Sequence, residues 1–164
     1  VRTMQTDDTF GLCLGDIVGW NHALYPQYNE VMSHTGVEFR NVIGNHDMTN
    51  WGRSHETSMK NYEDLFGPCW YSFNVGKIHY IVLNDNFFVG RDWFYIGYLD
   101  ERQLRWLEND LSYIPKGTNV VVSMHIPTTL DKSDRDAFRT DIMLVIAKRE
   151  SESMLILQTA DLEA

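Results

Sequence analysis

Five polar residues of metal-binding and proton-transfer types follow apolar segments in this 164-residue chain. Asp16 comes shortly after one such segment, Asn45, His46 and Asp47 stand in consecutive positions after a second, and His125 follows a run of valines. A carboxylate can bridge two cations about 3.5–4 Å apart, and amide oxygen and imidazole nitrogen are further metal ligands. The set therefore predicts hydrolysis assisted by two metal ions.

Each of these residues has its own expected role. Asp16 would bridge the two ions, Asn45 would add a neutral oxygen ligand, and His125 would add a nitrogen ligand of the kind that Zn, Fe and Mn sites prefer over Mg or Ca. His46 is then available to protonate the leaving-group oxygen, with Asp47 placed to hold its other ring nitrogen.

Single residues of this set also have simpler interpretations. Gly15-Asp16 is typical of an ordinary turn, and an isolated His125 is more often a hydrogen-bonded structural histidine. Consecutive amide, imidazole and carboxylate groups at 45–47 have little packing explanation. An entirely structural interpretation, in which all of these residues merely cap strands, requires three motifs to occur together by accident.

Strands must position these residues. The spacing of apolar residues, and the residues that interrupt it, predict where the strands lie. Apolar or alternating segments predict strands at residues 9–14, 37–43, 70–74, 77–83, 119–123 and 154–157, of which 70–74 and 77–83 form a hairpin. Helical spacing and caps predict helices at 25–33, 54–66, 136–148 and from Asp100 toward Pro115. Strands that alternate with helices predict an α/β layer fold, whose working residues collect at the carboxyl ends of strands. Asp85 also follows a predicted strand end.

For the remaining aromatic and histidine side chains, a structural role is the favoured interpretation. An aromatic-rich segment is predicted as a loop that could stack a sugar or base or act as a lid, although burial against the sheet or a helix is the favoured interpretation. It contains Phe87, Phe88, Trp93, Phe94, Tyr95 and Tyr98. We expect the other histidines to be structural or exposed to solvent, namely His22, His34, His55 and His79.

Composition limits the class of protein. Apolar residues make up 43% and charged residues 23% of the chain, which is globular composition. The net charge of −9 repels phosphate backbones, so nucleic acid is a poor candidate partner unless bound cations reverse the local field. No window approaches the roughly 18 apolar residues of a membrane span. Cys13 and Cys69, expected as buried thiols, leave the compartment open between cytoplasm and export.

Three segments of the sequence resemble the calcineurin-like metallophosphoesterases. They are Leu-Gly-Asp-Ile-Val at 14–18, Val-Ile-Gly-Asn-His-Asp at 42–47 and Val-Ser-Met-His-Ile-Pro at 122–127. The resemblance implies a four-layer α/β/β/α sandwich with two divalent transition metal ions, Zn, Mn or Fe, and a shared hydroxide that attacks phosphorus. It implies Asp16 as the bridging ligand, Asn45 and His125 as ligands of the second ion, and His46 as the proton donor paired with Asp47.

Two motifs of that family are missing from the chain. An Asp-x-His on an earlier strand and a Gly-His-x-His after the last strand do not occur, and the chain begins with Val1. We therefore expect residues 1–164 to be a single phosphoesterase domain, incomplete at both ends, with weak or partial metal occupancy and little activity of its own. The alternative is a non-catalytic interaction module that retains the fold.

The expected partners follow from this chemistry. A phosphoesterase acts on a phosphate-ester small molecule or a phosphorylated substrate, with no role for a membrane. A sheet that lacks a strand exposes unpaired edges, which favours association into homo-oligomers.

Overall fold

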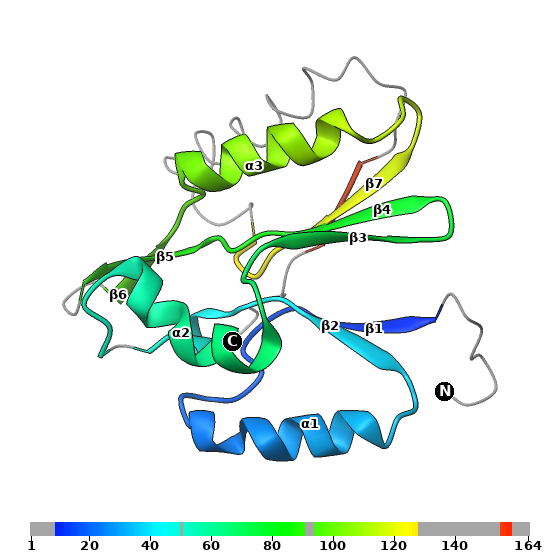
Figure 1. The fold of residues 1–164 in the computed structure, drawn as a ribbon. Helices are drawn as coiled ribbons and strands as arrows, with labels where there is room; N and C mark the ends of the chain where they lie inside the picture. The colour runs from blue at the N-terminus through cyan, green and yellow to red at the C-terminus, as the bar shows by residue number, and fades with distance from the viewer. Residues whose placement is uncertain (1–8, 50, 91–93, 128–154, 159–164) are drawn as a thin grey trace.

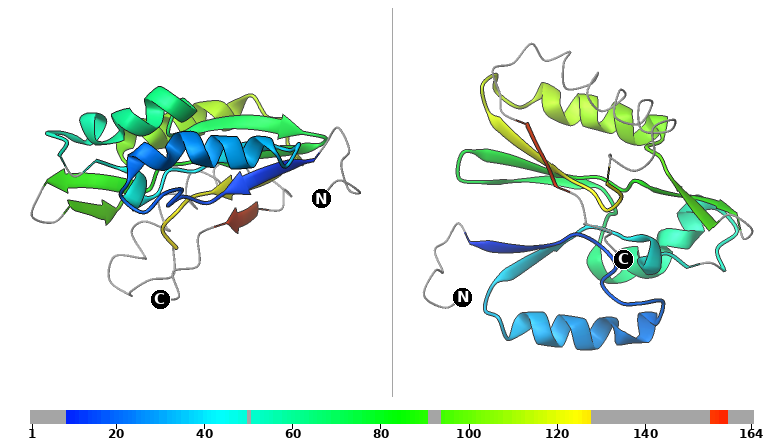
Figure 2. Two further views of the ribbon diagram at one scale, coloured as in Figure 1. Left: turned by 90° about the horizontal axis from the view of Figure 1, so that it is seen from below. Right: turned by 180° about the vertical axis from the view of Figure 1, so that it is seen from behind.

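The computed structural model describes residues 9–49, 51–90, 94–127 and 155–158. Its elements form four layers, in the order helix α1, the sheet of β1 and β2, the sheet of β3, β4, β7 and β8, and helix α3 (Figures 1 and 2). The predicted α/β fold class is confirmed. The outer helices are α1 (Tyr25–Ser33) and α3 (Glu101–Ser112), and the strands of the two sheets are β1 (Phe10–Cys13), β2 (Glu38–Asn41), β3 (Tyr71–Val75), β4 (Ile78–Val82), β7 (Asn119–Ser123) and β8 (Leu155–Gln158).

Parallel pairing places the chemically active loops at common edges. Strand β1 pairs in parallel with β2, and β4 pairs in parallel with β7, which pairs in parallel with β8. Strand β3 is antiparallel to β4, as the predicted hairpin requires. The loops after β1 and β2 therefore leave one sheet from the same edge, and the loops after β4 and β7 leave the other sheet in the same way.

Aromatic side chains fill the space between the two sheets. The ring of Phe10 on β1 lies 5.3 Å from the ring of Phe73 on β3 and 5.0 Å from that of Tyr80 on β4, edge to face in both cases. The hydroxyl of Tyr71 on β3 donates to the backbone carbonyl of Asn41 at the end of β2. Edge-to-face pairs are favourable beyond their buried area, so these contacts hold the sheets face to face.

The helices begin where the sequence predicts them to begin. Ser54 caps α2 (His55–Phe66) by accepting from the backbone of Thr57, and Asp100 caps α3 by accepting from the backbone of Gln103. Capping side chains satisfy backbone donors that the first turn of a helix leaves without partners. The apolar face of α3 then covers the second sheet, with a buried core of Ile81, Leu83, Leu99, Leu107, Leu111, Val120, Val122 and Met124.

The aromatic-rich segment differs from its prediction as a loop. It forms an antiparallel hairpin of β5 (Asn86–Gly90) and β6 (Phe94–Gly97), with a register shift between Phe88 and Gly90. Burial is uneven, since Phe88 is buried and Tyr98 is exposed. Trp93 and the helix predicted at 136–148 lie outside the described residues.

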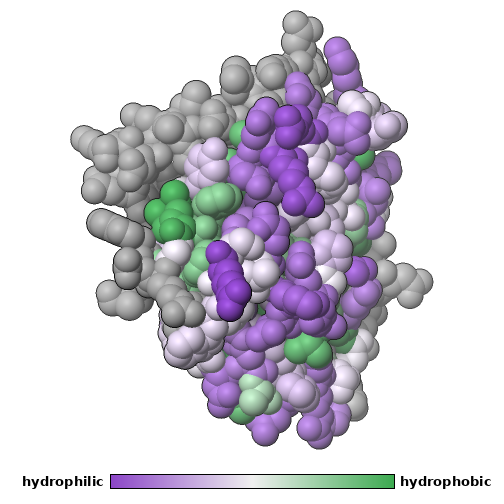
Figure 3. Space-filling view, turned by 60° about the vertical axis from the view of Figure 1, so that its left-hand side comes forward, coloured by the Kyte–Doolittle hydropathy of each residue, from purple (hydrophilic) through white to green (hydrophobic). Residues whose placement is uncertain are grey.

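The surface is mainly polar. The face in Figure 3 is mostly hydrophilic, with its hydrophobic residues in small separate groups. None of the helices formed by the described residues combines the length and apolar character needed to cross a bilayer. Of the two thiols, Cys69 is buried and Cys13 is partly buried, and neither forms a disulfide.

Candidate functional site

Two glycines allow the loops after β1 and β2 to touch. Gly15 has a φ of 96°, and a Cβ built on it would lie 2.5 Å from Nδ1 of His125 and 2.9 Å from the backbone of Gly44. A Cβ on Gly44 would overlap the backbone nitrogen and Oδ1 of Asp16. No side chain fits at either position, so glycine is required for the close approach that brings Asp16 beside the second loop.

Three electron-pair donors converge at this contact. Nδ1 of His125 lies 2.7 Å from the carbonyl oxygen of Leu14, and because a carbonyl oxygen only accepts, Nδ1 carries the proton of that bond. In the neutral ring, Nε2 then presents a lone pair to Oδ1 of Asn45 at 3.1 Å and to Oδ1 of Asp16 at 3.4 Å. A cation or a proton among the three atoms makes such an arrangement favourable, and nitrogen and oxygen donors of these types are ligands of transition-metal sites.

The convergence joins residues that the sequence predicts as ligands. Asp16, Asn45 and His125 come from three loops and two sheets. His125 and Asn45 are buried, whereas the side chain of Asp16 is 28% exposed and accessible from solvent. Among the described residues, no group of three or more His, Cys, Asp and Glu side chains has metal-binding geometry. The set reaches three donors through the amide of Asn45, so these are the residues that could hold one metal ion.

His46 lies beside this set with its ring partly exposed. Its backbone N–H donates to Oδ1 of Asp16 at 2.9 Å, and its Nε2 lies 4.0 Å from Oδ2 of the same carboxylate. The ring stacks on the indole of Trp20, with centroids 4.3 Å apart and an interplanar angle of 30°. His22 donates from Nε2 to the backbone carbonyl of His46 at 2.9 Å. These contacts present the imidazole to solvent next to the donor set.

Asp47 serves the backbone of the loops. Its buried carboxylate accepts from the N–H of Gly44 at 2.9 Å, from the N–H of Ile17 at 3.1 Å and from the hydroxyl of Tyr25 at 3.1 Å. Burial raises the pKa of Asp47, and the bonds from the backbone counteract this. Within the described residues, no bond joins Asp47 to the ring of His46, whose nearest carboxylate is that of Asp16. The expected pairing of Asp47 with His46 is therefore replaced by a role in holding the loops.

Asp85 holds the loop that carries His125. Its fully buried carboxylate accepts from the backbone N–H of His125 at 3.2 Å and from that of Ile126 at 2.8 Å. Burial raises the pKa of Asp85 to about 8, against the lowering by these two N–H groups. The next residue, Asn86, donates from its side chain to the carbonyl of Ile43 at 3.0 Å.

These bonds connect four loops into a closed ring. Asp47 connects the loop after β2 to the loop after β1, and Asn86, the first residue of β5, connects the end of the loop after β4 to the loop after β2. Asp85 connects the loop after β4 to the loop after β7, and His125 returns to the loop after β1 through Leu14. Each loop is bonded to two others, so the donor set is held from both sheets at once.

The sequence does not predict the roles of several of these supporting residues. Asp85 carries a detectable signal, since it follows a predicted strand end as the ligands do. Tyr25 and His22 carry none, because their bonds to Asp47 and to the carbonyl of His46 depend on how α1 packs beneath the loops. Burial raises the pKa of Tyr25, which keeps its hydroxyl protonated as a donor to Asp47.

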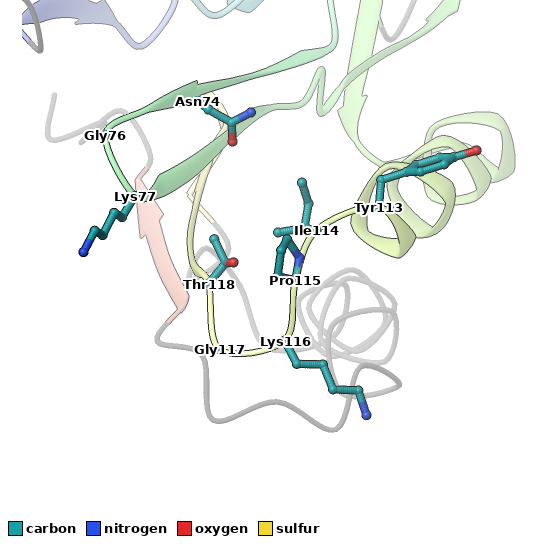
Figure 4. Close-up of a pocket in the computed structure, with 9 residues that line it drawn as sticks. All are labelled: Asn74, Gly76, Lys77, Tyr113, Ile114, Pro115, Lys116, Gly117 and Thr118. Carbon is teal, nitrogen blue, oxygen red and sulfur yellow. The ribbon is translucent and has the colours of Figure 1, made fainter.

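A pocket of about 570 Å³ lies away from the donor set (Figure 4). It is formed by the turn between β3 and β4 and by the loop between α3 and β7, and Lys77, Tyr113 and Lys116 are among its lining residues. The pocket adjoins the amino end of β7, whereas His125 follows the carboxyl end of that strand. None of the candidate site residues lines this pocket, so the pocket is separate from the candidate site.

Comparison with known proteins supports the fold. The chain is similar in structure to a purple acid phosphatase isolated from yellow lupin (Lupinus luteus) seeds, with a TM-score of 0.61 and 14% sequence identity. The likeness covers 88% of this chain and 29% of the lupin chain, so the chain spans less than a third of that protein's length. No family model and no curated protein matches the sequence. What the likeness shows is a shared α/β fold.

Proposed function

We propose that the chain provides a metal-dependent phosphoesterase centre that hydrolyses phosphate mono- or diesters. The observation that carries the proposal is the convergence of Oδ1 of Asp16, Oδ1 of Asn45 and Nε2 of His125. The α/β fold shared with a purple acid phosphatase supports it.

The donor set suits divalent transition metal ions such as Zn, Mn or Fe. Asp16, Asn45 and His125 would hold one ion together, and the second carboxylate oxygen of Asp16, which lies 4.0 Å from Nε2 of His46, would be the donor for a further ion. When bound, such ions act as Lewis acids that polarise the phosphoryl oxygens and lower the pKa of water. They also counteract the net charge of −9, which otherwise repels a phosphate ester.

His46 supplies the proton that the reaction needs. Water adds to phosphorus and releases a proton to solvent, the ester P–O bond breaks, and the leaving oxygen takes a proton from Nε2 of His46, which solvent then replaces. The ring is suited to this because Trp20 and the backbone bond to Asp16 fix its position while its side chain stays 35% exposed. Asp47 and Asp85 hold the loops in place without contacting the substrate.

Metal binding and turnover test the proposal separately. Calorimetric titration with Zn²⁺ and Mn²⁺ should show binding that weakens at least tenfold in Asn45→Ala and in His125→Ala, since each removes a donor. His34→Ala removes an exposed imidazole on the turn after α1 and serves as the control for adventitious binding. Hydrolysis of p-nitrophenyl phosphate and of its bis ester should fall in the His46→Asn variant while metal affinity stays within a factor of two.

A non-catalytic module is the alternative. It is favoured by the small donor set, which numbers three among the residues described. Metal binding without hydrolysis of either ester would support the module, and absence of binding that depends on Asn45 and His125 would reject the metal centre altogether. Under either function, the phosphate-ester partner and association into homo-oligomers remain predictions.

A further inference from the structure

Backbone strain concentrates at one place in the described part of the chain. Its non-glycine residues with positive φ are Asp16 at 52°, Trp20 at 55° and Phe94 at 59°. For a bulky residue this conformation is a genuine outlier, and it persists only where the surroundings impose it. Asp16 is a proposed ligand, and the other two are aromatic residues whose rings lie 5.0 Å apart. The strain therefore marks an aromatic extension of the site.

Trp20 is not explained by core packing. Its side chain is 47% exposed although one face stacks on the ring of His46. Exposure of a large indole at a strained backbone position is unfavourable for folding, which points to a role outside the core. Its position beside the exposed imidazole is the feature that requires an explanation.

The proposed role of His46 as proton donor indicates which part of the substrate would contact the indole of Trp20. A proton donor must come within about 3 Å of the ester oxygen that leaves, so the organic group on that oxygen lies next to the imidazole. The indole of Trp20 stacks on the imidazole with centroids 4.3 Å apart, and the ring of Phe94 lies next to the indole, tilted by 47°. A flat ring attached to the ester oxygen would find an offset-stacking partner there.

We infer that Trp20 determines specificity at the proposed phosphoesterase site, by stacking on the leaving group of aryl phosphates. The inference rests on the proposed function and adds the substrate class to it. Trp20 contacts the leaving group and not the phosphoryl group, so its loss should change selectivity without removing phosphate binding.

Two unreactive phosphonates test this without turnover. Phenylphosphonate and cyclohexylphosphonate share the charged group and the number of carbons, but only phenylphosphonate has a π face. Titration of the Zn²⁺-loaded chain, followed by phosphorus NMR, should show phenylphosphonate binding roughly 2- to 10-fold tighter, the range that one aromatic pair provides. In Trp20→Leu the two affinities should become equal, with that for cyclohexylphosphonate unchanged.

Further variants make the result decisive. Trp20→Gly also removes the ring, and glycine readily adopts the left-handed backbone of residue 20. The glycine variant therefore tests the inference even if the leucine variant folds poorly. Tyr113→Leu removes an aromatic ring that is more exposed than Trp20, 77% against 47%, lies beyond the amino end of β7, and should keep the preference. Equal affinities in the wild type, or a preference that survives both Trp20 variants, would overturn the inference alone. Failure of both phosphonates to bind the wild type would overturn the proposed function with it.

Discussion

The contact between the loops after β1 and β2 makes Gly44→Ala the most informative substitution. A Cβ at Gly44 would overlap the backbone nitrogen and Oδ1 of Asp16, although the φ of Gly44, −103°, is one that alanine adopts readily. The substitution therefore tests the close contact between residue 44 and Asp16 without adding backbone strain. Overpacking costs about 1–3 kcal/mol, and losing the bond from His46 N–H to the Asp16 carboxylate costs about 1.5–3 kcal/mol more.

We expect Gly44→Ala to lower the free energy of unfolding by about 2.5–6 kcal/mol, measured by urea denaturation. Gly19→Ala is the matched control, because a Cβ there would meet no atom within 4 Å and its backbone is not left-handed. It should change stability by less than about 1 kcal/mol. Zn²⁺ affinity, measured alongside, should fall only in Gly44→Ala. Equal stability and equal Zn²⁺ affinity in the two variants would refute the view that this contact positions Asp16.

Three further predictions concern the scaffold. Burial lowers the pKa of His55 from its ordinary value of 6.5, so the folded state binds a proton less readily than the unfolded chain does. The contribution of His55 to the free energy of unfolding should therefore be fully present above about pH 6.5 and decrease as the pH falls toward about 5. Urea denaturation at pH 7 and 5.5 should show a smaller loss in His55→Gln, and an equal loss would contradict this origin. Asp100→Ala, which removes the cap of α3, should cost about 0.5–2 kcal/mol, whereas Asp64→Ala, which breaks an exposed pair with Lys60, should cost less than about 0.5 kcal/mol. Leu107→Ala should cost about 2–5 kcal/mol in the same assay, because Leu107 lies on α3 with its side chain fully buried in the core against the second sheet, and a cost below about 1 kcal/mol would argue against that packing.

Local signals predict most of the fold. The helix expected at 25–33 has those bounds in the structure, the helix expected at 54–66 spans His55–Phe66, and Asp100 caps α3 as expected, because apolar spacing and capping act within a few residues. The hairpin of β5 and β6 is the exception. Its first strand has adjacent aromatic residues and a register shift near Gly90 instead of regular alternation, so its period is hidden.

The candidate site was predictable only in part. The ends of parallel strands meet at common edges, which is why Asp16, Asn45 and His125 converge as expected. The partners of Asp47 and the stacking of Trp20 on His46 depend on contacts between loops distant in sequence, and no local pattern encodes them.

The closed ring of loops ties the site to the stability of the whole molecule. The amide of Ile17 bonds Asp47, and those of His125 and Ile126 bond Asp85, so none of these three can open without breaking a link between two loops. Their hydrogens should therefore exchange with solvent slowly, because exchange requires a link in the closed ring of loops to break. Because each loop of the ring depends on two others, we expect proteolytic or thermal damage to either sheet to separate Asp16, Asn45 and His125.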